Sequence, residues 1–258
     1  MSNRPFERLF LNSKESASPA RAEALLGPYS ANAFAAAPIP DYLQKTYWWA
    51  YLHPNAVRIF ERQWLVNLIL WGNFARLRNA ALDEVGQVIN ERVLQVACVY
   101  GNFTEHLATR LGPEGHLNVI DVAPIQITNL HAKLKASQQV TLQRQDSSDL
   151  QFEDASQDAT VVFFLLHEQP LEVRLKTIAE AWRVTRPGGR LVFVDYHRPR
   201  ALNPFRYLMV PILTTLEPFA MDLWRTPITD WLPSGAEPAR VDKKTYFGGL
   251  YQKVVLQR

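Results

Sequence analysis

The spacing of apolar and polar residues becomes regular after residue 90. From there to residue 200, short apolar runs alternate with longer segments whose apolar residues recur at helical spacing. The runs predict strands at residues 92–96, 117–121, 140–144, 160–166 and 190–194. The intervening segments predict helices at residues 101–111, 125–135 and 171–185. This alternation, with its short connections, predicts a doubly wound α/β domain with a mostly parallel sheet.

The rest of the chain is less regular. Residues 1–40 are rich in Ala, Pro and Ser and predict a loosely ordered arm. Residues 55–81 predict one helix with Asn55 as its N-cap, and its apolar residues cover more than one face, which is typical of a helix that is buried or touches lipid. Residues 245–251 and 253–256 predict a closing antiparallel pair. We therefore expect an arm at 1–40, a helical aromatic lid at 41–84, and an α/β domain at 85–258 with an apolar insertion at about 200–232.

The amino-acid composition excludes several kinds of site and partner. The chain has 258 residues, of which 47% are hydrophobic, and a single cysteine, Cys98. One cysteine excludes an internal disulfide framework and a multi-cysteine zinc or iron–sulfur site. The net charge of +3 is too small to indicate a nucleic-acid partner, and the basic surplus lies in the two flanks of the chain. No export signal is evident near the N-terminus, and no apolar stretch reaches the roughly 20 residues of a membrane span, so we expect a cytoplasmic protein.

The candidate chemistry follows the predicted strands. In an open parallel sheet, ligands bind outside the carboxyl ends of the strands. Asp121 and Val122 follow the second strand, where a carboxylate can bridge two ribose hydroxyls, and Asp146 and Ser147 follow the third, where they can accept from an adenine amino group. The other residues at strand ends are Ala97, Tyr100, Gly101 and Asn102 after the first strand, His167 and Glu168 after the fourth, and Asp195 and His197 after the fifth.

One family resemblance rests on these positions. Asp121, Asp146, the apolar fourth strand and the turn Arg186-Pro187-Gly188-Gly189-Arg190-Leu191 resemble class I S-adenosylmethionine methyltransferases, in particular the ubiquinone and menaquinone C-methyltransferases. The resemblance covers about residues 85–200. It implies a Rossmann-like, doubly wound, mostly parallel seven-stranded sheet and S-adenosylmethionine as the cofactor. The cofactor-binding residues it implies are Ala97, Tyr100, Gly101, Asn102, Asp121, Val122, Asp146 and Ser147.

The first loop departs from that family. Where its members have an acidic residue followed by three alternating glycines, this chain has Gln95, Ala97, Val99 and Gly101. Glycine normally allows a positive φ and a close approach of the backbone to the ligand. Two interpretations remain open: drift in a weakened methyltransferase, or a site rebuilt so that the methionyl amino group is held differently.

A second resemblance favours the rebuilt site. Residues 42–54, which include Tyr47, Trp48, Trp49 and His53, together with the loop Val96-Ala97-Cys98-Val99-Tyr100-Gly101, are similar to the rhodoquinone-biosynthesis family RquA. This resemblance implies replacement of a ring methoxy group of ubiquinone by an amino group in anaerobic respiration, with S-adenosylmethionine as amino donor and manganese assisting. The alternatives are an S-adenosylmethionine-dependent quinone C- or O-methyltransferase and a non-catalytic, cofactor-binding protein of quinone biosynthesis.

Roles for the remaining residues follow from this hypothesis. His167, Asp195 and His197 are the predicted manganese ligands, since imidazole and carboxylate suit that ion, although they can instead position the quinone. Glu168 is the predicted base, with His167 as the second catalytic residue. Tyr47 and its aromatic neighbours form either core or a lid over the cofactor.

The expected partners are a lipid-soluble quinone and a bilayer surface. Residues 64–74 and 204–224 are apolar enough to shape a groove that faces lipid, and the basic flanks suit anionic headgroups. We therefore expect peripheral association with the inner membrane.

Overall fold

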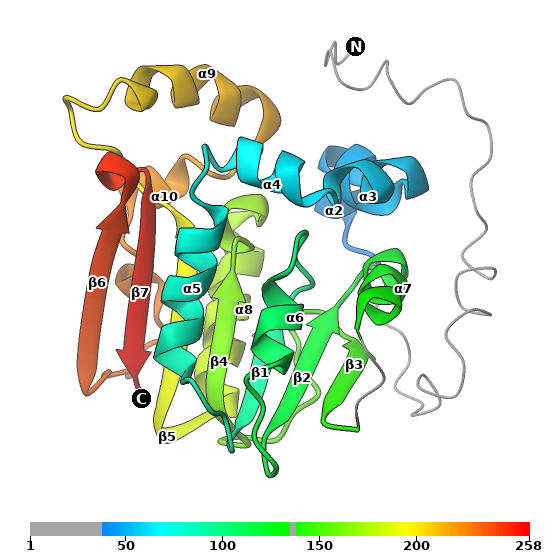
Figure 1. Ribbon diagram of the computed structural model, residues 1–258. Helices are drawn as coiled ribbons and strands as arrows, with labels where there is room; N and C mark the ends of the chain where they lie inside the picture. Colours follow the sequence, from blue (N-terminus) through cyan, green and yellow to red (C-terminus); the bar gives the residue numbers. More distant parts are fainter. Residues whose placement is uncertain (1–37, 135–137) are drawn as a thin grey trace.

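A single twisted sheet forms the centre of the protein (Figure 1). The computed structural model describes residues 38–134 and 138–258. Within them, seven strands are arranged in the order β3-β2-β1-β4-β5-β7-β6. The strands are β1 (Arg92–Val96), β2 (His116–Asp121), β3 (Val140–Arg144), β4 (Gln157–Phe163), β5 (Thr185–Tyr196), β6 (Arg240–Tyr246) and β7 (Tyr251–Gln257). β1 to β5 are parallel, whereas β7 is antiparallel to both β5 and β6. The predicted doubly wound, mostly parallel seven-stranded fold is confirmed.

Helices cover both faces of this sheet. In Figure 1, α5 (Phe74–Val85) and α6 (Phe103–Ala108) lie in front of the strands, and α8 (Leu171–Val184) lies behind them. α7 (Pro124–Lys133) packs against β2 and β3. β4 is the central strand and is almost entirely buried, as its apolar run predicts. The reversal of strand order between β1 and β4 places the ligand crevice at their carboxyl ends.

The first described elements lie across that end of the sheet (Figure 1). They are α2 (Asp41–Thr46), the π-helical turn η3 (Trp48–Leu52), α3 (Pro54–Phe60) and α4 (Gln63–Ile69). The prediction of one helix over 55–81 is wrong, because the chain is extended at Arg62 and left-handed at Gly72, with φ +75°. The N-cap is His53 rather than Asn55: the His53 imidazole accepts the Asn55 N–H at 3.2 Å.

The ends of several other strands and helices differ from the sequence predictions. The fourth strand ends at Phe163, before the predicted 166, and Leu166–Glu168 form the short helix η4. The closing antiparallel pair is confirmed, but its first strand is Arg240–Tyr246 rather than 245–251. The apolar stretch after residue 204 forms α9 (Phe205–Leu216) and α10 (Asp222–Arg225), and short helices follow at η5 (Ile228–Trp231) and η6 (Phe247–Gly249). The predicted arm lies almost wholly outside the described residues.

No helix among residues 38–134 and 138–258 is both long enough and apolar enough to cross a bilayer.

Candidate active site

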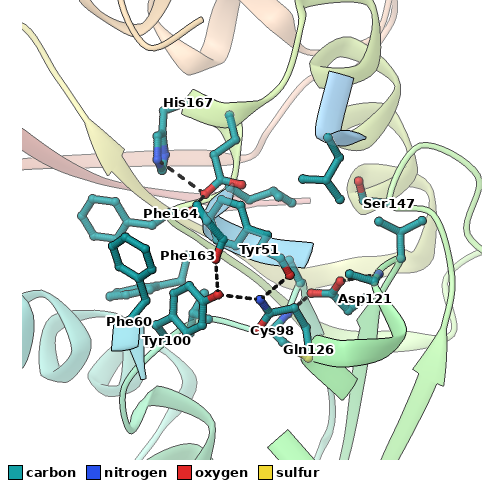
Figure 2. A pocket seen from close by; sticks show the side chains of 18 of the residues that line it. Tyr51, Phe60, Cys98, Tyr100, Asp121, Gln126, Ser147, Phe163, Phe164 and His167 are labelled. Atoms are coloured by element: carbon teal, nitrogen blue, oxygen red, sulfur yellow. Dashed lines mark hydrogen bonds and ion pairs between the residues drawn. The ribbon is translucent and has the colours of Figure 1, made fainter. Parts of the chain in front are cut away.

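A cavity opens at the carboxyl ends of the parallel strands, beneath the first described helices. One end is lined by residues at the end of β2 and after β3, and the other by residues after β4 and by Tyr196, the last residue of β5 (Figure 2). The lining residues used below are Tyr51, Ala97, Tyr100, Asp121, Val122, Gln126, Asp146, Ser147, Phe164, His167, Glu168, Tyr196 and Glu217. The cavity therefore joins the predicted nucleoside residues to the predicted catalytic residues.

Asp121 occupies the last position of β2 and is 8% exposed. One carboxylate oxygen accepts the Ala123 N–H at 2.8 Å, and the other accepts the Cys98 N–H at the same distance. Burial raises the pKa of Asp121 to about 6, and those two N–H donors oppose the rise. Each oxygen keeps further lone pairs, so the carboxylate can still accept from two ribose hydroxyls. Asp121 thereby ties the loops after β1 and β2 together at the place where a nucleoside would lie.

Asp146 and Ser147 line the same end of the cavity. One oxygen of Asp146 accepts both the N–H and the hydroxyl of Ser148, at 2.8 and 2.7 Å, which fixes the turn after β3. The Ser147 hydroxyl lies 2.8 Å from that of Thr177 and accepts from the Gln169 amide at 3.0 Å. Both residues are thus held by the chain around them at the end of the cavity that Asp121 also lines.

The first loop keeps the backbone conformation of a glycine-rich loop at a position that holds alanine. Ala97 has φ +72°, a conformation that glycine normally adopts, at the place where the methyltransferase pattern has its first glycine. The Gln95 side chain is fully buried and donates to the Ala97 carbonyl at 3.0 Å, so it stabilises this turn. Gln95 lies outside the cavity lining, and no carboxylate takes its place there. The loop is therefore shaped for close approach to a ligand, but it lacks the usual acidic partner.

Stacked aromatic rings form the wall between the two ends of the cavity (Figure 2). The rings of Tyr51 and Tyr100 stack with centroids 5.6 Å apart, and Phe60 stacks on Tyr100 at 5.9 Å. Gln126 donates to the Tyr100 hydroxyl at 2.8 Å and to the Tyr51 carbonyl at 3.1 Å, and the Tyr100 hydroxyl donates to the Ala50 carbonyl at 2.6 Å. These bonds attach the η3 turn to α7 and to the first loop, which fixes the wall.

A buried acid–base cluster forms the other end. His167 and Glu168 belong to η4, and both are less than a tenth exposed. Asp195 Oδ1 lies 2.9 Å from His167 Nδ1, and Glu168 Oε1 lies 3.7 Å from His167 Nε2. The Tyr51 hydroxyl donates to Glu168 Oε1. His167 is thus placed between two carboxylates, and only Glu168 is also held by the aromatic wall.

Burial sets the proton affinity of this cluster. Burial raises the pKa of Glu168 to about 8, and the negative charge of Glu217 adds to the rise, whereas His167 and the Tyr51 hydrogen bond oppose it. Burial alone lowers the pKa of His167, but the adjacent Asp195 reverses this and raises it to about 9. Both groups therefore bind protons more tightly than in water, and Glu168 exchanges its proton near neutral pH, as a general acid or base must.

Arg174 holds this cluster in place from behind. Its side chain is fully buried on α8, and it donates to the carbonyls of Leu166 and Gln169, which flank His167 and Glu168, at 2.9 and 2.8 Å. It also donates to the Phe219 carbonyl at 2.8 Å and to Asp222 at 3.3 Å. One guanidinium thus joins η4 to the segment after α9, which supplies Glu217 to the cavity.

The structure brings together some of the predicted site residues and not others. Ala97, Tyr100, Asp121, Val122, Asp146, Ser147, His167 and Glu168 line the cavity. Tyr47 is fully buried and packs with Leu43 and Ala123, so it forms core. Gly101 has φ +81°, and its carbonyl accepts from Lys133, while the Asn102 side chain accepts from Arg78. Tyr47, Gly101 and Asn102 are not among the lining residues.

The predicted manganese ligands do not converge. His167 pairs with Asp195, but the His197 ring bonds the Gly249 carbonyl at 2.8 Å and does not line the cavity. Across the two described segments, no three His, Cys, Asp or Glu side chains are placed to hold a metal ion. Of the three predicted ligands, His167 and Asp195 therefore lie together and His197 does not join them, and manganese stays a prediction.

Three residues of the site were missed in the sequence. Tyr51 was counted in the aromatic block of a possible lid but was given no role at the site, and it contacts Glu168. Tyr47, which was predicted to bind the cofactor, precedes the π-helical turn and is buried. Gln126 on α7 carried no sequence signal. Glu217 had one, since it is a carboxylate within an otherwise apolar stretch.

Comparison with known proteins agrees with this geometry. Residues 93–189 match the family model described as a methyltransferase domain. These matches support a class I S-adenosylmethionine methyltransferase-like protein. It is 31% identical over 165 residues to the demethylmenaquinone methyltransferase of Tropheryma whipplei, an alignment that covers 61% of this chain and 66% of that protein. The chain spans 55–66% of the length of the curated relatives it matches.

Solved structures show the same fold. An S-adenosylmethionine-dependent methyltransferase from Aquifex aeolicus superposes with a TM-score of 0.50 at 18% identity, covering 79% of this chain and 97% of that one. The [4+2]-cyclase SpnF superposes with a TM-score of 0.52 at 15% identity, covering 71% and 80%. Likeness at this level shows the fold, and the cyclase illustrates that one fold serves different reactions. The family match supports S-adenosylmethionine as the cofactor.

Proposed function

We propose that this protein is an S-adenosylmethionine-dependent transferase that acts on the ring of a quinone. The observation that carries the proposal is the continuous cavity with Asp121 and Asp146 at one end and His167 and Glu168 at the other. The first end suits a nucleoside, and the second suits a ring whose oxygens exchange protons. The aromatic wall of Tyr51, Phe60 and Tyr100 offers flat surfaces against which a quinone ring can stack.

The first candidate reaction is methyl transfer to the quinone ring. The relatives named as demethylmenaquinone methyltransferases support it. S-adenosylmethionine supplies an electrophilic methyl group when bound. Glu168 would take the proton that a ring hydroxyl or ring carbon loses as the new bond forms, and its pKa of about 8 suits this role near neutral pH.

The second candidate reaction replaces a ring methoxy group with an amino group, as the rhodoquinone resemblance implies. The specific observation in its favour is the first loop: Gln95 is turned into the core, so the acidic partner that methyltransferases offer to the cofactor's amino group is missing. An amine left without that carboxylate is free to be oriented toward the ring.

Glu168 would also transfer the proton in this second reaction. It would take the proton that the donor amine loses as the nitrogen bonds to the ring carbon, and return it to the departing methoxy oxygen, so that methanol leaves. This exchange of nitrogen for oxygen needs no oxidant, but it leaves the donor's carbon skeleton on the nitrogen. The free amino group would then be released by an elimination: a proton leaves the donor's β-carbon, the bond between the nitrogen and the α-carbon breaks, and the donor departs as an α,β-unsaturated acid. His167, held by Asp195, would stabilise the negative charge that develops on the adjacent quinone oxygen.

One incubation distinguishes these reactions. The protein is mixed with a ubiquinone, or its demethylated precursor, and with S-adenosylmethionine that carries deuterium in the methyl group and heavy nitrogen in the amino group. Deuterium in the product, with a mass increase of one labelled methyl group, supports methyl transfer. Heavy nitrogen together with loss of a methoxy group supports amination.

The control is Glu168→Gln in the same mixtures, with and without added manganese. Product that carries neither label, or no product under any condition although S-adenosylmethionine binds, contradicts the proposal and favours a non-catalytic cofactor-binding protein of quinone biosynthesis.

A further inference from the structure

Exposed apolar side chains are concentrated on the helices around the cavity. On α4, Trp64 is 61% exposed and Leu68 is 59% exposed. In the turn before α9 and on α9 itself, Leu202 is 97% exposed and Tyr207 is 70% exposed. Figure 1 shows α4 and α9 along the same edge of the molecule, beyond the carboxyl ends of the strands. We define these four side chains as the apolar rim.

The rim is continuous with the interior of the cavity. Ile69 of α4 is half-exposed and also lines the cavity, next to its neighbours Val66 and Leu70. At the other side, Glu217 directly follows α9 and lines the cavity. Ile69 therefore connects the apolar rim to the lining of the cavity.

Exposed arginines flank the apolar rim. Arg58 and Arg62 are exposed on and after α3, and Arg198 and Arg200 are exposed before α9. Residues 198–216 contain no acidic residue. The acidic residue nearest to the first pair, Glu61, is bound by Lys133 and Asn129. An apolar patch flanked by exposed arginines matches a bilayer with anionic headgroups.

We propose that the apolar rim and its four arginines dock this protein onto an anionic lipid bilayer, so that a polyprenyl quinone enters the cavity from the membrane past Ile69. The docking follows from the surface alone, whereas the entry of the quinone rests on the proposed function. A long apolar tail then stays in lipid while the ring reaches His167 and Glu168.

Vesicle flotation tests the docking. The parent protein is mixed with vesicles of phosphatidylcholine alone, or of phosphatidylcholine with phosphatidylglycerol, and should float with the anionic vesicles and lose binding in high salt. Trp64→Ser combined with Leu202→Ser should weaken binding at least about tenfold. Arg198→Gln and Arg200→Gln should each weaken binding to anionic vesicles about fivefold.

The matched control is Val88→Ser, since Val88 is 69% exposed but lies before β1, at the amino end of the sheet. It should float like the parent. Equal flotation of the parent and the rim variants, or no flotation of the parent, overturns the proposal. A parent that elutes as a dimer while the rim variants elute as monomers also overturns it, because the rim would then bind a second copy.

Turnover separates this inference from the proposed function. With a short-tailed quinone in solution, the rim variants should retain the parent rate, whereas with a long-tailed quinone in vesicles they should lose at least about tenfold. Flotation as expected without turnover of either quinone refutes the proposed function and leaves the docking intact. Turnover of the short-tailed quinone without flotation refutes the docking alone.

Discussion

The Tyr51 hydroxyl donates a hydrogen bond to the Glu168 carboxylate, although 117 positions separate the two residues in the sequence. The bond connects the helical segment above the cavity to the acid–base cluster beneath it. It also lowers the pKa of Glu168, against the larger rise that burial causes. The position of Tyr51 in the aromatic wall therefore affects the pKa of Glu168, the candidate base.

Tyr51→Phe tests this coupling. Loss of the hydroxyl removes a hydrogen bond that favours the charged carboxylate, so the apparent pKa of the ascending limb of the rate profile should rise by about one unit, with the stacking on Tyr100 retained. The measurement is kcat/KM against pH. Tyr246→Phe, which is buried outside the cavity, is the control and should leave the profile in place.

Glu168→Gln tests the base itself. The glutamine keeps the shape of the side chain but cannot accept a proton, so turnover should fall about a hundredfold to ten-thousandfold while S-adenosylmethionine affinity is retained. The rate of the parent should rise as pH increases through about 8, and this rise should be absent in the variant. A variant that retains the parent rate and pH profile would remove Glu168 from the reaction.

The stability of the fold should depend on whether Glu168 and His167 are protonated. The folded-state pKa values of Glu168 and His167, about 8 and about 9, both lie above their ordinary values. A group of this kind stabilises the fold fully below its unfolded pKa and loses that contribution as pH rises through its folded pKa. The melting temperature of the parent should therefore fall from about pH 4.5 to about pH 9 more steeply than that of a Glu168→Gln, His167→Gln double variant. Parallel melting curves over this range would contradict the assignment.

Arg174→Met tests the support behind the catalytic pair. The change leaves the buried carbonyls of Leu166, Gln169 and Phe219 without their donor and should cost at least about 2 kcal/mol of stability. Where the variant folds, kcat should fall more than KM rises, because η4 loses its fixed position. Arg225→Met is the matched control, since Arg225 pairs with the same Asp222 but is 72% exposed, and it should change little.

The unusual first loop is tested by restoring the family pattern. Gln95→Asp, Ala97→Gly and Val99→Gly together should retain S-adenosylmethionine binding, because Asp121 and Asp146 are unchanged. They should lower amination if the altered loop orients the amino group. Equal or faster amination by the restored loop would show that the departure is drift.

The sequence predicted what depends on local pattern. The alternation of strands and helices gave the parallel sheet, and with it the positions of Asp121, Asp146 and Glu168 at the strand ends. It could not reveal that η3 forms a π-helical turn in which Tyr51 lines the cavity, nor that Tyr47 just before this turn is buried in the core. Nor could it reveal Arg174, because its partners are backbone carbonyls that any residue can offer.

The central claim, that S-adenosylmethionine lies against Asp121 in this cavity, is tested most directly by calorimetric titration of the protein with that molecule. Asp121→Ala should weaken binding by about 1.5–3 kcal/mol, the range for hydrogen bonds to a charged acceptor. The control is Asp242→Ala, on the edge strand β6, which should bind like the parent. Unchanged affinity of a folded Asp121→Ala variant, or no binding by the parent, would contradict the account.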